Sequence, residues 1–178
     1  MKNKITKDEI LRHLRYDPST GIFLRNKRPP NDFTSIRIAN SWNSRYADKP
    51  AGTVNSAGYV SIIINYNQYY AHRLAFVIMT GEWPEYEIDH INTIESDNRW
   101  ENLRAATSAQ NKHNTKNRTT SISGFKGVSF DKRSQKWRAC ITINKKLNDL
   151  GLFLEKESAY LAYCNAAEKY FGEFARLA

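Results

Sequence analysis

Apolar and polar residues alternate in the middle of the chain, over residues 51–76. This segment, AGTVNSAGYVSIIINYNQYYAHRLAF, carries turn signals at NSAG and YNQ, so its pattern predicts a β-hairpin or a meander. The residues from Arg73 to Thr80 predict a short buried helix that ends at Gly81.

The N-terminal part of the chain is less regular. Its first segment, TKDEILRHLRYDPSTGIF, predicts a short helix that begins near Thr6, where Glu9 completes a capping box. The turn DPSTG ends this helix. The stretch that follows contains RPPND and SWNSR and has only a loose pattern.

The pattern becomes regular again after Gly124. FKGVSF, KWRACITIN and LNDLGLF alternate like three strands, with breaks at DKRSQ and NKK. A helix is predicted from about Glu157 to Phe171, and one of its faces carries small and aromatic residues at helical spacing: Ala159, Ala162, Tyr163, Ala166, Ala167 and Tyr170. The C-terminal part therefore predicts three strands packed on one helix, and the polar segment NTKNRTTSISG before it predicts a linker.

Composition narrows the class of protein. The chain has 178 residues, enough for one domain or two small ones, and 40% of them are hydrophobic, so we expect packed cores. Lys and Arg number 27 against 18 Asp and Glu, a net charge of +9 that favours nucleic acid as partner, with an anionic membrane surface as the second choice.

Membrane insertion, secretion and zinc binding are not expected. The longest apolar run, LAFVIM, is too short to span a bilayer, and the start MKNKITKDEI has no apolar leader segment, so we expect a cytoplasmic protein. The two cysteines, Cys140 and Cys164, fit neither a CxxC zinc knuckle nor a disulfide framework, and we expect them to fill the core.

Asp89 and His90 stand side by side in the stretch YEIDHIN. Taken alone, such a pair is more often structural, here a strand end with two polar caps, than reactive. The spacing of two asparagines favours a reactive site, because Asn102 follows His90 after 11 residues and Asn111 follows Asn102 after 8. Two short strands folded around the ESDN turn, with the next helix laid across them, would bring these four side chains together.

These residue types suit phosphodiester hydrolysis, which needs a base, a cation and donors that grip the phosphate. A neutral His90 can take a proton from water, with Asn102 or a backbone carbonyl orienting its ring. Asp89 and Asn111 offer hard oxygen ligands, so we expect Mg²⁺, or Mn²⁺ as a substitute, rather than zinc. The residues expected to hold DNA phosphates are Arg73, Arg99, Arg104, Lys112, Lys116 and Arg118.

The run AHRLAFVIMTGEWPEYEIDHINTIESDNRWENLRAATSAQNKHN resembles the HNH endonuclease family, in particular its branch of phage homing and free-standing endonucleases with a ββα-metal site. The likeness covers about Tyr70 to Asn117 and includes the DH pair, the DNRxxNLR block and the final QN. It implies His90 as general base, Asp89 and Asn111 as metal ligands, and Asn102 as the central asparagine of the motif. Many relatives have histidine where Asn111 stands, and this difference moves the expected metal toward Mg²⁺.

Two other histidines have alternative interpretations. His113, in the helix that Thr107 or Ser108 caps, would be the motif histidine in a shifted register; it points about 200° away from Asn111, and the spacing favours Asn111. His72 is either a phosphate contact or a polar residue at a strand end.

The segment GFKGVSFDKRSQKWRACITINKKLNDLGLFLEKESAYLAYCNAAEKYFGEFA resembles the Apetala/ethylene-response-factor type of DNA-binding domain, from Gly124 to Leu177. The resemblance implies a three-stranded sheet lying in a DNA major groove. Seven Lys or Arg and one acidic residue between Lys126 and Lys146 agree with this. The candidate contacts are Lys126, Ser129, Arg133, Lys136, Trp137, Arg138 and Thr142; the alternative is that Trp137 packs in the core and the lysines only solvate the sheet.

The sequence thus predicts an α+β protein with a β-rich N-terminal region that leads into a ββα-metal nuclease module, then a three-stranded antiparallel sheet on one helix. The predicted boundaries are 1–69, 70–117, 118–123 for a linker, and 124–178. The predicted function is a metal-dependent, phage-encoded endonuclease of the homing type that acts on double-stranded DNA. Its predicted location is the cytoplasm, that of the bacterial host if it is phage-encoded. The alternatives are a DNA-binding regulator with a silent nuclease module and a basic RNA-associated protein. We expect a monomer that nicks DNA, although a dimer would cut both strands.

Overall fold

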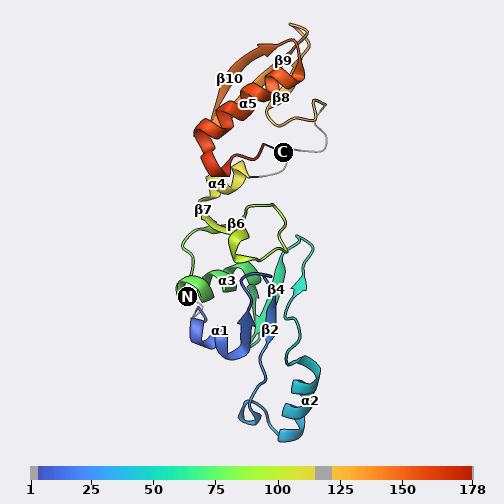
Figure 1. The fold of residues 1–178 in the computed structure, drawn as a ribbon, viewed down its shortest axis with the longest axis vertical. Coiled ribbons are helices and arrows are strands. Elements are labelled where there is room, and N and C mark those ends of the chain that lie inside the picture. The colour runs from blue at the N-terminus through green and yellow to red at the C-terminus, as the bar shows by residue number, and fades with distance from the viewer. Residues whose placement is uncertain (1–3, 115–121, 178) are drawn as a thin grey trace. The chain divides into compact units, whose positions relative to one another are not determined.

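The computed structural model describes residues 4–114 and 122–177. The chain divides into two compact units, Met1–Ala106 and Thr107–Ala178. Figure 1 gives the order of the elements along the chain. Most of the predicted linker, residues 118–121, lies outside the described residues.

Unit 1 mixes short helices and short antiparallel strands. Its elements are α1 (Lys7–His13), β1 (Leu14–Tyr16), β2 (Phe23–Arg25), the 3-10 turn η1 (Pro30–Asp32), α2 (Ile36–Tyr46), β3 (Thr53–Val54), β4 (Val60–Ile64), β5 (Asn67–Tyr70), α3 (Ala71–Thr80), β6 (Glu87–His90), the 3-10 turn η2 (Trp100–Asn102) and β7 (Leu103–Ala106). The strands pair as three small sheets, β1 with β2, β3-β4-β5, and β6 with β7.

The core of unit 1 lies between α1, α3 and the β3-β4-β5 meander. Its largest fully buried side chains are Ile10, Leu14, Ile62, Leu74 and Val77. The predicted meander and the predicted helix after it are both confirmed, although α3 begins two residues earlier, at Ala71. It ends at Gly81, whose φ of 88° suits a residue without a side chain.

Helix α1 begins where the sequence predicts it. Thr6 is its N-cap, and its side-chain oxygen accepts a hydrogen bond of 3.2 Å from Glu9 N. This bond satisfies one of the backbone donors that the first helical turn leaves without a partner.

Helix α2 falls in the loosely patterned stretch, where the sequence predicts no element. Ser35 caps it by accepting a hydrogen bond from Ile38 N at 3.3 Å. Of its eleven residues only Ala39 is buried. Ala39, Trp42 and Tyr46 share one face, but the exposed Ile36 and Ile38 lie beside that face and obscure the apolar stripe by which a helix is recognised in sequence.

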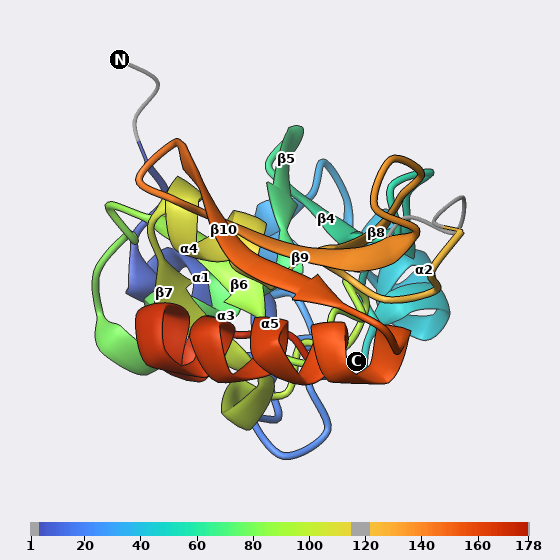
Figure 2. The same cartoon turned by 90° about the horizontal axis from the view of Figure 1, so that it is seen from above.

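Unit 2 contains α4 (Ser108–His113), β8 (Val128–Asp131), β9 (Lys136–Ile143), β10 (Lys146–Phe153), α5 (Lys156–Phe171) and the 3-10 turn η3 (Gly172–Phe174). The three strands form an antiparallel sheet in the order β10-β9-β8, and α5 packs against one face of it (Figure 2). The predicted α+β class and the three-stranded sheet on one helix are therefore confirmed.

The small residues of α5 face the sheet. Ala159, Ala166 and Ala167 are buried, and the only large buried side chain of the helix is Tyr163. Cys140 and Cys164 are both free thiols and half-buried, so neither is a fully buried core residue as the sequence suggested. Across the described ranges, no helix is long and apolar enough to cross a membrane.

Candidate active site and DNA-binding surface

Asp89 and His90 are the last two residues of β6, which pairs with β7 as a hairpin. Asp89 lies opposite Arg104 and His90 lies opposite Leu103. Both acidic and imidazole side chains are buried, with 4% and 5% of their surface exposed. Buried polar groups persist only where hydrogen bonds or ion pairs stabilise them, so these two are not simple polar caps of a strand.

The loop between β6 and β7 is held by Asn102. Its Oδ1 accepts a hydrogen bond from Asn92 N at 2.9 Å, and its Nδ2 donates one to the Asp97 carbonyl at 2.8 Å. Asn102 is buried and joins the two ends of the loop through both halves of its amide. Its described contacts are to the loop backbone, and another asparagine lies against His90.

That residue is Asn98. Its Nδ2 donates to the Ser96 carbonyl at 3.0 Å, which turns its Oδ1 toward His90 Nε2, at 3.5 Å. An amide oxygen accepts but does not donate, so this contact favours the proton on Nε2 and makes Nδ1 the basic nitrogen of His90. Burial lowers the pKa of His90, and the Asn98 contact opposes that shift. Asn98 stands in the DNR part of the motif, and no local pattern singles it out.

His72 lies beside His90 and is buried. Its ring meets the ring of His90 edge-on at 5.1 Å and stacks on Tyr70 at 5.5 Å, while Tyr59 packs near both histidines. Burial, followed by the charge of His90, lowers the pKa of His72 to about 3, so its ring is neutral. Its Nδ1 is a buried nitrogen with no hydrogen-bond partner among the described residues. Neither expectation for His72 placed it next to the predicted base.

The arginines predicted to hold phosphates contact protein groups. Arg104 donates through Nε and Nη2 to Oδ2 of Asp89, at 2.8 and 2.7 Å. Arg99 pairs with Asp97 at 2.8 Å, and this hydrogen bonding lowers the pKa of Asp97 to about 2. Arg73 is half-buried and donates to the Pro84 carbonyl at 3.3 Å.

Residues 14–25 of the N-terminal region pack against the loop between β6 and β7. Tyr16 Oη donates to the Asn98 carbonyl at 2.7 Å, and burial raises the pKa of Tyr16 to about 12, so the hydroxyl keeps its proton. Gly21 approaches so closely that a Cβ at this position would lie 2.4 Å from Arg99 N. Residues 14–25 are therefore part of the site's framework, a role that no local motif indicates.

Asn111 lies on α4, in unit 2. Thr107 caps this helix in a complete capping box, accepting from Gln110 N while the Gln110 side chain accepts from Thr107 N. Lys112 is exposed. The side chain of His113 and the residues Lys116 and Arg118 lie outside the described part of the chain. The approach of Asn111 to Asp89 stays a prediction.

The donor set suits a hard cation with few protein ligands. No group of three or more His, Cys, Asp or Glu side chains able to hold a metal ion occurs in residues 4–114 and 122–177. Asp89 would supply a carboxylate and Asn111 an amide oxygen, and two such protein ligands suit Mg²⁺ when phosphate and water complete its shell. These residues therefore fit Mg²⁺ or Mn²⁺ better than a protein-enclosed zinc site.

The exposed face of the C-terminal sheet holds four of its seven candidate DNA contacts. Lys136, Arg138 and Thr142 alternate along β9 on this face, and Ser129 lies opposite Arg138 on β8. Arg133 is exposed in the turn between these strands, and Lys126 is half-buried before β8.

Trp137 lies on the other face of the sheet. It packs beside the buried Val128, Ala139 and Ala159, with its ring 5.0 Å from Phe130. This is the packing role that was weighed against a DNA contact. Arg138 pairs with Asp149 at 2.6 Å across the exposed face.

The chain is similar to known proteins in sequence and structure. A family profile described as HNH endonuclease matches residues 69–113. The chain is 32% identical over 87 residues to Protein 3.8 of Escherichia phage T7, a match that covers 46% of this chain and 72% of that protein. It is also similar to a solved structure entitled "DNA binding and cleavage by the HNH homing endonuclease I-HmuI", with 17% identity, coverage of 89% of this chain and 85% of that one, and a TM-score of 0.39.

Proposed function

The chain belongs to the HNH endonuclease family, and on that premise we propose that it hydrolyses phosphodiester bonds of double-stranded DNA with His90 as the general base. The observation that carries this proposal is the setting of His90, buried at the end of β6 with its Nε2 directed at Asn98 Oδ1. The ring is thereby oriented with Nδ1 as the proton acceptor.

Each residue of the hairpin has a part in this scheme. His90 Nδ1 takes a proton from the water that attacks phosphorus, the P–O3′ bond breaks, and the products carry a 5′ phosphate and a 3′ hydroxyl. Asn98 is a positioning residue for His90. Asn102 keeps the loop closed, so that Asn98 stays in place.

Asp89 and Asn111 would hold Mg²⁺, with Mn²⁺ as a substitute. When bound, this ion supplies positive charge at the oxygens where negative charge develops during hydrolysis. Arg104 already holds Oδ2 of Asp89, which fixes the orientation of the carboxylate. A buried, fixed carboxylate is pre-organised for a cation, because little side-chain freedom is lost on binding.

We assign target binding to the exposed face of β8, β9 and β10. Lys136 and Arg138 suit phosphate oxygens, and Ser129 and Thr142 can donate to phosphates or base edges. Because Arg138 is shared with Asp149, contact with DNA requires exchange of that ion pair. One active site in a chain that acts as a monomer predicts a nick in one strand.

Nicking of supercoiled plasmid in Mg²⁺ tests the proposal. The wild-type chain should yield open-circular DNA, and His90→Ala should lower the rate by about 100-fold or more, the usual contribution of a general base. Metal-dependent nicking that survives His90→Ala would show that the base lies elsewhere. DNA binding without nicking by the wild-type chain would support a regulator with a silent nuclease module.

The metal ligand on α4 has its own control. Asn111→Ala should abolish nicking while His113→Ala retains it, because positions two residues apart on an α-helix are separated by about 200° around its axis. The reverse outcome would assign the site to His113 and move the expected metal away from Mg²⁺.

A further inference from the structure

Residues 26–49 form an arm at the end of unit 1 opposite the β6-β7 hairpin (Figure 1). The chain segments that enter and leave the arm are hydrogen-bonded to each other: Asp48 N donates to the Arg25 carbonyl at 2.8 Å, and Arg25 N donates to the Lys49 carbonyl at 3.0 Å. Farther from the base of the arm, Asn43 exchanges two hydrogen bonds with the backbone of Arg28, at 2.8 and 2.9 Å. The arm therefore has a defined internal structure and is not a loose loop.

Helix α2 has two different faces within this arm. Ala39, Trp42 and Tyr46 lie on one side, where Trp42 contacts Phe33 at 5.8 Å and Tyr46 at 5.4 Å. The opposite side holds Arg37, Ser41, Ser44 and Arg45, which fall within an arc of about 100° on a helical wheel. All four of these side chains are exposed.

The charge of the arm is strongly positive. Within residues 26–49 there are five Lys or Arg and two Asp, which leaves three of the nine net positive charges in this one segment. Both Asp residues are already paired, Asp32 with Arg12 and Arg28, and Asp48 with Arg15.

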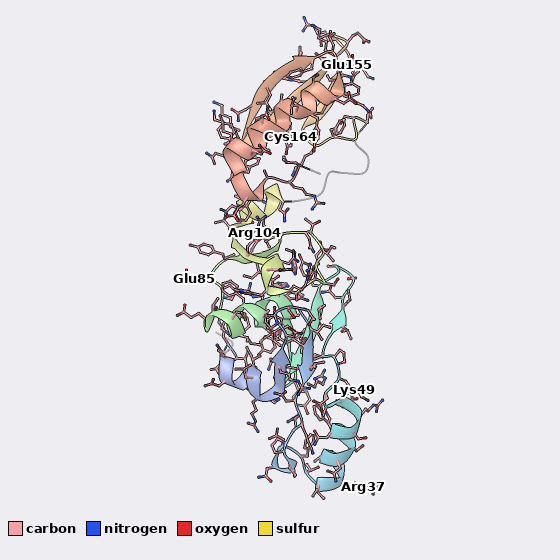
Figure 3. The ribbon with its side chains drawn as sticks, viewed as in Figure 1. Arg37, Lys49, Glu85, Arg104, Glu155 and Cys164 are labelled. Atoms are coloured by element: carbon pink, nitrogen blue, oxygen red, sulfur yellow. The ribbon has the colours of Figure 1, made fainter. Side chains whose placement is uncertain are left out.

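Several basic residues of the arm are not neutralised in this way. No carboxylate of the described residues lies within salt-bridge distance of Lys27, Arg37, Arg45 or Lys49, and Figure 3 shows Arg37 and Lys49 at this end of the unit. Arg45 lies over the ring of Tyr46 at 5.5 Å, which limits the freedom of its guanidinium.

We propose that the arm is a second DNA-binding surface, in which Arg37 and Arg45 contact backbone phosphates of duplex DNA away from the scissile bond. Arginine and serine are the side chains that commonly bind phosphate oxygens, and unneutralised basic residues gain affinity by releasing counterions. This role in DNA binding rests on the proposed function, but no residue of the arm takes part in the proposed hydrolysis.

The test is the salt dependence of binding to a labelled DNA duplex, measured by fluorescence anisotropy with the full chain in EDTA. Losing two phosphate contacts in Arg37→Gln/Arg45→Gln should reduce the slope of log K against log salt by about 1.8. That reduction corresponds to about 30-fold weaker binding at about 0.15 M salt, and the difference should vanish near about 1 M.

A matched control removes the same charge elsewhere. Lys156→Gln/Lys169→Gln changes two lysines of α5 and should leave the slope as in the wild type, while Arg37→Lys/Arg45→Lys should restore it. Because all the changed side chains are wholly or partly exposed, the melting curves should coincide. In plasmid nicking, the arm variant should raise KM and retain kcat.

Two outcomes would overturn the inference. One is an unchanged slope in Arg37→Gln/Arg45→Gln; the other is a slope that falls for an RNA duplex and not for DNA. The binding assay needs no cleavage, so a chain that fails to nick DNA yet shows the lower slope would refute the proposed function alone. A chain that nicks DNA with an unchanged slope would refute only the role of the arm.

Discussion

Replacing Asn102 by alanine separates two roles for this buried asparagine. In the structure its amide makes two hydrogen bonds, from Asn92 N at 2.9 Å and to the Asp97 carbonyl at 2.8 Å. Each such bond contributes about 1 kcal/mol, and leaving a buried partner unsatisfied costs about 1–3 kcal/mol. Asn102→Ala should therefore lower the stability of unit 1 by about 2–4 kcal/mol.

Thermal unfolding followed by tryptophan fluorescence measures this loss. At about 4 °C for each kcal/mol in a domain of about 100 residues, the melting temperature of unit 1 should fall by about 8–16 °C. Trp100 is two residues from Asn102 and reports on the loop, whereas Trp137 reports on unit 2, whose transition should not move. Asn40→Ala on the exposed side of α2 is the control and should melt like the wild type.

Asn102→Asp gives a second check on the same bonds. The introduced carboxyl keeps an acceptor for Asn92 N but sets a negative oxygen against the Asp97 carbonyl. Its pKa should be raised in the folded chain, so the stability deficit should shrink as the pH falls and the carboxyl becomes a donor. If Asn102→Ala melts at the wild-type temperature and yet fails to nick DNA, the two hydrogen bonds of Asn102 do not stabilise the loop and Asn102 acts in the chemistry.

Three further results are expected. Burial lowers the pKa of His72 to about 3, so below pH 6.5 the unfolded chain takes up a proton that the folded chain does not, and the wild type loses stability as the pH falls from 6.5 to about 3. His72→Phe should reduce this loss of stability. A pH series of denaturant midpoints measures it. Gly21→Ala should destabilise unit 1 and weaken nicking, since a Cβ there would lie 2.4 Å from Arg99 N, and Gly58→Ala, with nothing closer than 3.4 Å, is the milder control for a glycine of positive φ. Arg104→Gln should lower the free energy of unfolding by about 3 kcal/mol, because it leaves the buried carboxylate of Asp89 without the guanidinium, and Arg104→Lys should restore part of it. Equal denaturant midpoints for the wild type and both variants would show that the ion pair adds no stability.

The spacing of apolar residues predicted most of the elements, because an element that buries one face has apolar residues at regular intervals. The meander, the helix after it and the C-terminal sheet with α5 each bury one face, and the spacing of apolar residues records which face that is. Helix α2 buries only Ala39, and the exposed Ile36 and Ile38 obscure the helical spacing of Ala39, Trp42 and Tyr46. Its capping residue, Ser35, is too common in loops to indicate a helix alone.

The residues around His90 were predictable to different degrees. The sequence brought out Asp89 and His90 because two side chains with reactive groups stand together at a recognisable spacing from Asn102. It assigned the orientation of His90 to Asn102 or a backbone carbonyl, whereas the structure places Asn98 against the ring. Both asparagines lie in the same short block, and only the path of the loop backbone distinguishes them.

Chain order, spacing and charge are properties of the amino-acid sequence, so the fold class, the hairpin that carries Asp89 and His90, and the positive charge that favours DNA could be predicted from it. The folded chain was needed to show that His72 is buried against His90, that Trp137 packs on the helix side of its sheet, and that Tyr16 and Gly21 support the loop around Asn98. Those contacts join residues as many as 82 positions apart, and no local pattern encodes which distant side chain fills a given space.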